Sequence, residues 1–262
     1  NSSIRQTMNP AIAFSLQQRI ALVIGSTSGI GKALARGYLQ AGAQVVIAGR
    51  DAGKLAAALD ELAQFGAISG YQADVSGEEG LRGLVGIVLA NLGHIDVLVN
   101  CQGVTVLKPA EEFSRADWAQ IMDTDLQSVF FACTEVGRHM LGRGRGTIIN
   151  IASLSSHRGW PRSALYAIAK AGVYSLTQTL GAEWATRGVR VNAISPGFFM
   201  TELNRDKMAP ERKALALART PAGRFGEVDE LVGAAIYLAS DAAGFVTGQS
   251  IAVDGGFLAT GL

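Results

Sequence analysis

The 262-residue sequence predicts an α/β fold: a single doubly wound domain in which a seven-stranded parallel sheet carries helices on both faces. Short runs of Val, Ile and Leu alternate with Ala- and Leu-rich stretches of helical spacing along the whole chain. Runs that are apolar throughout are typical of strands buried on both faces, as in parallel sheets. No linker, charge block, repeat or low-complexity segment divides the chain.

Seven apolar runs are expected to form the strands of this sheet. They lie at residues 20–24, 45–48, 68–73, 95–99, 147–152, 191–194 and 251–253. Between them, helical spacing is clearest at residues 32–40, 54–65 and 231–239, and a longer helix is expected at about 164–185. We expect residues 14–262 to form the domain, and residues 1–13 to be an N-terminal extension that is disordered or foreign to the native chain.

The composition excludes several classes of function. Lys and Arg number 23 and Asp and Glu number 22, so the net charge of +1 gives no reason to expect nucleic acid or an anionic membrane as partner. No apolar run approaches the ~20 residues of a membrane span. Cys101 and Cys133 cannot form a disulfide framework, and His94, His139 and His157 share no spacing of metal ligands, so no metal is expected. We therefore expect a soluble cytoplasmic protein.

A glycine-rich turn follows the first expected strand and opens the next helix. Its sequence is Gly25-Ser26-Thr27-Ser28-Gly29-Ile30-Gly31. Glycine allows positive φ and lets backbone N–H groups approach a pyrophosphate, which the helix N-terminus also attracts. Tight strand–helix turns need glycine in any case, but the place of this turn after the first strand favours a dinucleotide site. The expected cofactor contacts here are Gly25, Ser26, Ser28, Gly29, Ile30 and Gly31.

The end of the second expected strand indicates which dinucleotide is bound. An NAD site usually places an acidic residue there for the adenosine ribose 2′-hydroxyl, whereas an arginine accommodates a 2′-phosphate. Gly49 offers no carboxylate, and Arg50 offers a planar, bidentate donor. Asp51 follows, but we expect it to cap the next helix. The sequence therefore favours NADP, with NAD as the alternative.

Ser153, Tyr166 and Lys170 are the candidate catalytic residues. Tyr166 and Lys170 are four residues apart, so they share one face of a helix. A tyrosine normally holds its proton at neutral pH, but a nearby ammonium favours the phenolate, which can act as a base. Ser153 can hold a substrate oxygen by a hydrogen bond. Because Tyr-x3-Lys also occurs on ordinary amphipathic helices, its value depends on the motifs around it.

These motifs together resemble the short-chain dehydrogenase/reductase family over about residues 14–262. The matching pieces, in chain order, are Gly25-x3-Gly29-x-Gly31, Asp74-Val75, Asn100-x2-Gly103, Ser153, Tyr166-x3-Lys170, Asn192, Pro196-Gly197 and Thr201. The resemblance implies a single Rossmann-type domain and an NAD(P)-dependent oxidoreductase. It implies that Tyr166 is the acid–base, that Lys170 binds the ribose hydroxyls, and that Ser153 positions the substrate carbonyl.

The resemblance also implies further cofactor contacts beyond the glycine-rich turn. They are Asp74 and Val75 at the adenine, Asn100 and Gly103 along the cofactor, and Pro196, Gly197 and Thr201 at the nicotinamide carboxamide.

Three positions depart from the family pattern. Ile24 replaces the usual Thr, and Cys101-Gln102 replaces Asn-Ala in the segment after the fourth strand. Asp125 stands where the family usually has a catalytic Asn, so it is also a candidate catalytic residue. An ionised Asp125 near Lys170 would partly cancel the effect of the ammonium on the tyrosine. Alternatively, the family role depends on the backbone there, and Asp serves nearly as well as Asn.

Within the family, residues 48–51, 198–205 and 219–226 look like those of gluconate 5-dehydrogenases. The expected reaction is the interconversion of a secondary alcohol and a ketone on a sugar acid or polyol. The alternatives are an enzyme like the 3-oxoacyl carrier-protein reductases and a weakly catalytic dinucleotide-binding module. His157, Arg158, Asn204 and Arg205 are expected to border the substrate, where arginine would favour a carboxylate, unless these side chains simply lie in solvent.

A homotetramer is expected from the long helix at about residues 164–185. Val173, Leu176, Leu180 and Trp184 make it apolar on more than one face, beside the face of Tyr166. Such a helix is buried on both sides, one against its own sheet and the other against a symmetry mate. Proteins of the resembled family are commonly tetramers.

Overall fold

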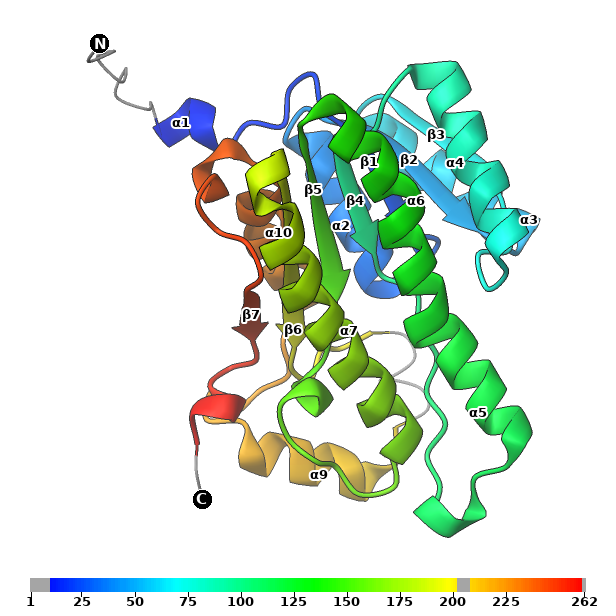
Figure 1. Cartoon of the computed structure of the whole chain (residues 1–262). Helices are drawn as coiled ribbons and strands as arrows, with labels where there is room; N and C mark the ends of the chain where they lie inside the picture. The colour runs from blue at the N-terminus through cyan, green and yellow to red at the C-terminus, as the bar shows by residue number, and fades with distance from the viewer. Residues whose placement is uncertain (1–9, 202–207, 261–262) are drawn as a thin grey trace.

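The computed structural model describes residues 10–201 and 208–260. A single parallel sheet of seven strands has the order β3-β2-β1-β4-β5-β6-β7, which confirms the predicted fold class (Figure 1). The strands are β1 Ile20–Ile24, β2 Gln44–Gly49, β3 Ile68–Gln72, β4 Val97–Asn100, β5 Gly146–Ile151, β6 Val189–Pro196 and β7 Ser250–Val253. The chain moves from β1 outward to β3 and then returns to the other side of β1. This reversal creates a switch point between β1 and β4, beyond whose carboxyl ends ligands bind in such sheets.

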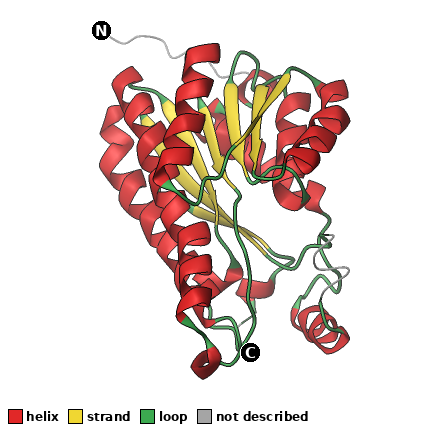
Figure 2. Cartoon of the chain, turned by 90° about the vertical axis from the view of Figure 1, so that its right-hand side faces the viewer, coloured by secondary structure: helices red, strands yellow, loops and turns green. Residues whose placement is uncertain are grey.

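Helices cover both faces of the sheet, as predicted for a doubly wound fold (Figure 2). One face is covered by α2 Gly29–Gln40, α3 Ala52–Leu62 and α10 Val232–Ala239. The other face is covered by α4 Glu78–Leu92, α6 Ser128–Arg143 and α7 Ala164–Trp184. Two further helices, α5 Arg115–Met122 and α9 Pro210–Arg219, extend beyond the carboxyl ends of the strands (Figure 1).

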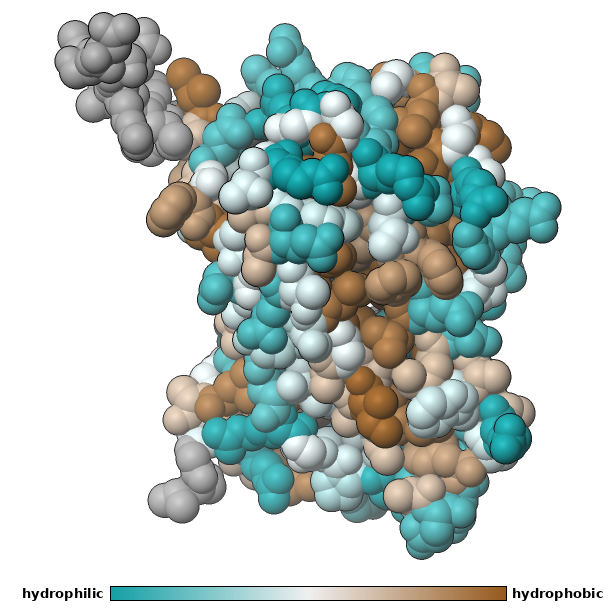
Figure 3. Space-filling view, viewed as in Figure 1, coloured by the Kyte–Doolittle hydropathy of each residue, from teal (hydrophilic) through white to brown (hydrophobic). Residues whose placement is uncertain are grey.

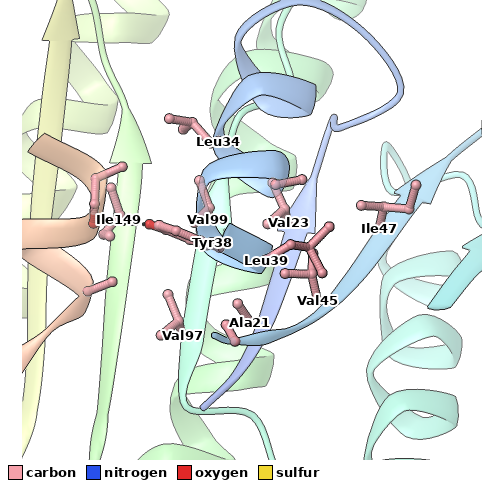
Figure 4. Packing of buried hydrophobic residues seen from close by; sticks show 14 of the residues in the cluster. Ala21, Val23, Leu34, Tyr38, Leu39, Val45, Ile47, Val97, Val99 and Ile149 are labelled. Atoms are coloured by element: carbon pink, nitrogen blue, oxygen red, sulfur yellow. Dashed lines mark hydrogen bonds between the residues drawn. The ribbon is translucent and has the colours of Figure 1, made fainter. Parts of the chain in front are cut away.

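Alternating side chains of each strand supply the two cores. In β1, Ala21 and Val23 join the core beneath α2, while Leu22 points into the core beneath α6. Figure 4 shows Tyr38 and Leu39 of α2 packed over the first of these sets. Complete burial of such side chains stabilises the fold by about 1.5–3 kcal/mol each. Tyr38 also donates its hydroxyl hydrogen to the carbonyl of Ala235 at 3.2 Å, which ties α2 to α10.

The N-terminal extension proposed for residues 1–13 stays a prediction, because residues 1–9 lie outside the described residues. Residues Pro10–Ala13 form the short helix α1, in which Ala13 is buried. Within the described ranges, no helix is both long and apolar enough to cross a bilayer.

Candidate active site

The parallel topology brings the predicted site residues to one edge of the sheet. Gly25 follows β1, Asn100 ends β4, Ser153 follows β5 and Pro196 ends β6. The strands run in the same direction, so these four positions lie at the same, carboxyl edge. In Figure 1 this is the lower edge of the sheet, with the start of α7 and the whole of α9 beneath it.

The glycine-rich turn needs glycine for reasons of space. Gly25 has a φ of +76°, and a Cβ there would lie 2.6 Å from the backbone nitrogen of Gln102. A Cβ on Gly31 would lie 2.1 Å from the carbonyl oxygen of Gly25. Gly29 also has positive φ, at +55°, and begins α2. The turn is therefore a closely packed backbone that leads into a helix N-terminus, as a pyrophosphate site requires.

The serines of this turn have different environments. Ser26 is completely buried, and its Oγ donates to the carbonyl of Val23 at 2.6 Å. Its hydroxyl therefore belongs to the fold, and only its backbone is available to a cofactor. Ser28 is the exposed N-cap residue of α2 and forms no capping hydrogen bond, so its hydroxyl is available. Ile30 is half-buried and packs against the core under α2.

The residues expected at the adenosine meet at the ends of β2 and β3. Arg50 is exposed, and its carbonyl accepts a hydrogen bond from Gln72 at 2.9 Å. Hydrogen bonds from the hydroxyl and N–H of Ser76 lower the pKa of Asp74, and the positive charge of Arg50 adds to this effect. Val75 follows Asp74 and is half-buried. Within the described ranges, the Arg50 guanidinium has no hydrogen-bond or ion-pair partner, so it is available to a phosphate.

Two neighbouring residues fix the geometry of this region. Asp51 caps α3, as predicted, by accepting the N–H of Lys54 at 2.9 Å. A Cβ on Gly49 would lie 2.5 Å from Cγ2 of Thr27 in the glycine-rich turn. Glycine at position 49 thus lets β2 pack against that turn, a reason that the sequence alone did not reveal.

Tyr166 and Lys170 lie on α7 with the predicted relation. The Nζ of Lys170 is 5.7 Å from the centroid of the Tyr166 ring. Lys170 is 4% exposed, and its Nζ donates to the carbonyl of Ile151 at 3.1 Å. Its ammonium thus lies under a half-buried phenol at the end of β5. This is the arrangement in which a positive charge favours the phenolate.

Asp125 lies beside Lys170. It belongs to a π-helical turn, Asp123–Gln127 (η3), which joins α5 to α6. Such turns are frequent at functional sites because the widened turn redirects a side chain. The Asp125 side chain is fully buried, its Oδ2 lies 3.6 Å from Nζ of Lys170, and its Oδ1 accepts the N–H of Val104 at 2.7 Å.

The two charges act on each other. Burial raises the pKa of Asp125, although the ammonium of Lys170 and the N–H of Val104 oppose this rise. Burial, the largest single influence, acts to lower the pKa of Lys170, but the nearby charges, of which Asp125 is the strongest, together outweigh it, so the net direction is upward. Gly103 lies against the pair, because a Cβ there would be 3.0 Å from Oδ2 of Asp125 and 3.4 Å from Nζ of Lys170.

The other departures from the family pattern lie in the segment after β4. The Gln102 side chain is buried, and its Nε2 donates to Oγ of Ser128, which in turn donates to the carbonyl of Thr124 in η3. Gln102 therefore joins this segment to the turn that carries Asp125. Burial raises the pKa of the Cys101 thiol to about 12, so this thiol stays neutral.

Ser153 is placed to meet a substrate oxygen. Its Oγ accepts the N–H of Ser155 at 3.1 Å at the start of a short helical turn, Leu154–Ser156. An acceptor in that bond still has its own hydroxyl hydrogen to donate. The side chain is half-buried at the end of β5.

The Asn100 side chain turns into the sheet. It is 1% exposed, and its Nδ2 donates to Oδ1 of Asn150 at 2.9 Å. The Asn150 amide then donates to Thr177, which extends this polar chain to α7. Likewise, the Asn192 side chain binds the backbone of Val246 and Gln249 and holds the segment before β7. These polar residues lie within apolar strands and hold the elements around the site in place.

The segment expected at the nicotinamide lies close to the glycine-rich turn. Cγ2 of Thr201 is 4.0 Å from the Cβ position of Gly29. Pro196 is buried, and a Cβ on Gly197 would lie 2.7 Å from the Cα of Asp254. The chain therefore turns sharply after β6 and crosses towards α2, where a bound cofactor would contact both segments.

The residues predicted to border the substrate contact other parts of the protein in this structure. His157 Nε2 lies 3.0 Å from Oγ of Ser195 in β6, and its ring packs on Tyr174 with centroids 4.8 Å apart. Arg158 donates to the carbonyl of Leu258 at 3.2 Å. Both side chains are thus engaged with the frame. Asn204 and Arg205 lie outside the described residues.

Sequence reasoning missed an aromatic and basic cluster beyond these residues. The Trp160 ring packs against Phe198 and Phe257, with centroids 5.5 and 5.8 Å away. Arg212 and Arg219 of α9 both lie over the same ring, at 5.7 and 5.8 Å. In the sequence, the basic residues at each end of α9 were the one available signal of this cluster.

These features define a class of protein. The sheet is doubly wound, and the turn at its switch point requires glycine. Nearby, a buried lysine lies under a tyrosine, beside a serine whose hydroxyl hydrogen is available. Together these features make up the site of a dinucleotide-dependent alcohol oxidoreductase. The family model described as enoyl-(acyl carrier protein) reductase matches residues 24–258. The chain belongs to the short-chain dehydrogenase/reductase family, as the motifs predicted.

Several known proteins are similar over nearly the whole chain. Gluconate 5-dehydrogenase of Gluconobacter oxydans (strain 621H) is 41% identical over 245 residues, which cover 93% of this chain and 96% of the relative. D-threitol dehydrogenase of Mycolicibacterium smegmatis is 38% identical over 253 residues, covering 96% and 97%. The crystal structure of a gluconate 5-dehydrogenase from Burkholderia cenocepacia J2315 in complex with NADP and tartrate has a TM-score of 0.92 and 40% identity, covering 96% and 100%.

Proposed function

We propose that the protein is an NADP-preferring dehydrogenase that interconverts a secondary hydroxyl group of a sugar acid and the corresponding ketone. The observation that carries this proposal is the Lys170 ammonium 5.7 Å from the centre of the Tyr166 ring. The names of two relatives, both gluconate 5-dehydrogenases, support the substrate class. When bound, the nicotinamide supplies the acceptor or donor of hydride.

The residues of the chain handle the proton and the substrate oxygen. In the direction of alcohol oxidation, the Tyr166 phenolate takes the proton of the substrate hydroxyl, and in reduction the phenol returns it. Ser153 donates a hydrogen bond to the same substrate oxygen and orients it. Lys170 favours the phenolate through its charge, which burial leaves poorly screened by water. Each turnover converts an alcohol and NADP⁺ to a ketone, NADPH and a proton.

The cofactor fits the residues that are present. A side chain at Gly25 or Gly31 would collide with neighbouring backbone, so glycine at these positions allows the tight turn that a pyrophosphate site requires. Arg50, which has no partner among the described residues, supports a preference for the 2′-phosphate of NADP over the hydroxyl of NAD. The backbone of Gly103, beside Lys170, and the side chain of Thr201, beside Gly29, would complete the nicotinamide end.

A panel of substrates tests this function. Turnover of NADP⁺ and NAD⁺ would be measured with sugar acids, with neutral polyols of equal length and, in reverse, with 3-oxoacyl thioesters. We expect the highest kcat/KM with a sugar acid and NADP⁺. A preference for 3-oxoacyl thioesters would favour the alternative of an enzyme like the 3-oxoacyl carrier-protein reductases. No turnover with any substrate would favour a weakly catalytic binding module.

We also infer a homotetramer, on grounds that differ from those in the sequence. Val173, Leu180 and Trp184 pack into the core of their own subunit. The apolar surface is instead supplied by Phe130 of α6 and Ile168 of α7, which are 43% and 49% exposed. Figure 3 shows hydrophobic atoms along this face, the one that α6 and α7 present in Figure 1. Light scattering that gave a stable 27.4 kDa monomer would contradict the assembly.

A cytoplasmic location completes the proposal. Cys101 and Cys133 are both free, as expected in a reducing compartment. Fractionation of cells that express the protein would test the location, and recovery from an oxidising compartment would contradict it.

A further inference from the structure

Two arginines lie over one indole at the carboxyl edge of the sheet, and a third lies near one of them. Arg212 and Arg219 of α9 place their Cζ atoms 5.7 and 5.8 Å from the centroid of the Trp160 ring. Arg162, two residues after Trp160, is close enough for its charge to act on Arg212. Across residues 10–201 and 208–260, no carboxylate forms an ion pair with any of the three.

This arginine cluster lies next to the segments that carry the chemistry. Trp160 falls between Ser153 and Tyr166 in the chain. Its ring packs on Phe198, which belongs to the segment after β6 that reaches the glycine-rich turn. In Figure 1, α9 crosses the molecule below the carboxyl ends of β5 and β7. The cluster therefore borders the place where the part of a substrate remote from its reacting carbon would lie.

The cluster is electrostatically unfavourable without an anion. Several other arginines are neutralised, such as Arg19 by Asp241 and Arg224 by Glu230. In contrast, burial lowers the pKa of Arg212, and the like charge of Arg162 lowers it further. The Trp160 ring offers some compensation by cation–π contact. Arg212 is half-buried, whereas Arg162 and Arg219 are exposed. Like charges gathered without a carboxylate are what an anion-binding site contains before its ligand arrives.

We propose that Arg162, Arg212 and Arg219 hold the carboxylate of a sugar-acid substrate against Trp160, an inference that rests on the function proposed above. A guanidinium binds a planar carboxylate through two parallel hydrogen bonds, and an indole under its plane limits the orientations it can take. The carboxylate is remote from the reacting hydroxyl, so this contact holds substrate and transition state alike.

Steady-state kinetics of Arg212→Gln and Arg219→Gln test the proposal. We expect KM for gluconate to rise at least about tenfold in each variant, the scale of a lost charge-assisted hydrogen bond, with little change in kcat. KM for sorbitol, a neutral polyol of the same length, should stay unchanged, as should the Kd for NADPH, which also reports on folding. Arg212→Lys should recover part of the loss, because it keeps the charge without the bidentate geometry.

A matched control removes an arginine at the opposite edge of the sheet. Arg187 is exposed and lies two residues before the start of β6. Arg187→Gln should leave KM for gluconate unchanged. If KM rose as much in this variant as in the other two, the loss of net charge alone would explain the effect, and the proposed site would be wrong. Tartrate, titrated into the NADP complex, gives a readout without turnover. It should bind more weakly to Arg212→Gln and Arg219→Gln than to the parent.

Failure of this inference can be separated from failure of the proposed function. If the parent oxidises gluconate and both glutamine variants keep its KM and tartrate affinity, the arginine site is wrong and the proposed function stands. If the parent turns over only neutral polyols, the proposed function fails and the carboxylate site fails with it.

Discussion

The carboxylate of Asp125 lies 3.6 Å from the ammonium of Lys170, with both side chains almost wholly buried. In most of the family, as the sequence comparison implied, an uncharged Asn occupies the position of Asp125. The buried pair helps to keep Lys170 protonated, because Asp125 is the strongest of the nearby charges that together raise the pKa of Lys170 against the effect of burial. The same negative charge also offsets part of the positive field at Tyr166. The pair thus stabilises the lysine charge but weakens its effect on the catalytic phenol.

Asp125→Asn should therefore move the pH profile of alcohol oxidation to lower pH. Removing the carboxylate leaves the positive charge of Lys170 less offset, so negative charge on the Tyr166 oxygen is better stabilised and the acidic limb moves down. It also removes the charge that raises the pKa of Lys170, so the alkaline limb, where the ammonium is lost, moves down as well. The measurement is kcat/KM against pH. An unchanged profile would show that Asp125 acts through its backbone alone.

Asp125→Ala is the control for this prediction. Asn retains an oxygen that accepts the N–H of Val104, whereas Ala leaves that N–H without its present acceptor. Asp125→Ala should thus lower the melting temperature more than Asp125→Asn does, since a polar group left unpaired in a buried site costs about 1–3 kcal/mol.

Tyr166→Phe tests the acid–base role directly. It removes the group that exchanges the proton and keeps the ring beside Lys170. General acid–base catalysis contributes about 10²- to 10⁴-fold, so kcat should fall within or beyond that range. Fluorescence titration with NADPH should give an affinity close to that of the parent, which shows that the site is intact. Turnover near the level of the parent would refute the assignment.

Arg50→Ala tests the cofactor preference. The parent should bind NADPH more tightly than NADH, and the variant should lose much of this difference in binding free energy. The expected loss lies at the lower end of about 1.5–3 kcal/mol, because Arg50 is exposed to solvent. Arg82→Ala is a suitable control, because Arg82 is also exposed but pairs with Glu78 on α4. Equal dissociation constants for NADPH and NADH in the parent would remove the basis for NADP preference.

The sheet could be predicted because the signals for its strands and turns lie in short stretches of the sequence. Each apolar run becomes a strand, and the inner strands are buried on both faces, whereas the edge strands β3 and β7 are largely half-buried. A glycine or polar residue at the end of a run starts a turn. The Tyr166–Lys170 relation was also predictable, because helix geometry alone places residues four apart on one face. Asp51 as a helix cap follows from the same kind of local rule.

Contacts between segments far apart in the chain could not be predicted from the sequence. Nothing in the chain indicates that Gln102 reaches Ser128, or that Arg219 lies over Trp160, because these contacts depend on how whole elements pack. His157 was placed correctly on its loop, but its hydrogen bond to Ser195 depends on where β6 ends. Asn100 matched the family motif, yet its side chain turns inward to a neighbouring strand.

Two glycine-to-alanine substitutions in helices test whether the dinucleotide turn is limited by space. In Gly31→Ala the new methyl group would lie 2.1 Å from the carbonyl oxygen of Gly25, so the turn must open. We expect a loss of about 1–3 kcal/mol in the free energy of unfolding, as for other overpacked sites, together with weaker binding of NADPH. Gly83→Ala lies within α4 with nothing within 4 Å of the new Cβ, so it should stabilise the protein by roughly 0.5–1 kcal/mol through helix propensity alone. Chemical denaturation and NADPH titration of both variants give the comparison. If Gly31→Ala matched Gly83→Ala in both measurements, the turn would have room for a side chain, and its glycines would not be there to admit a pyrophosphate.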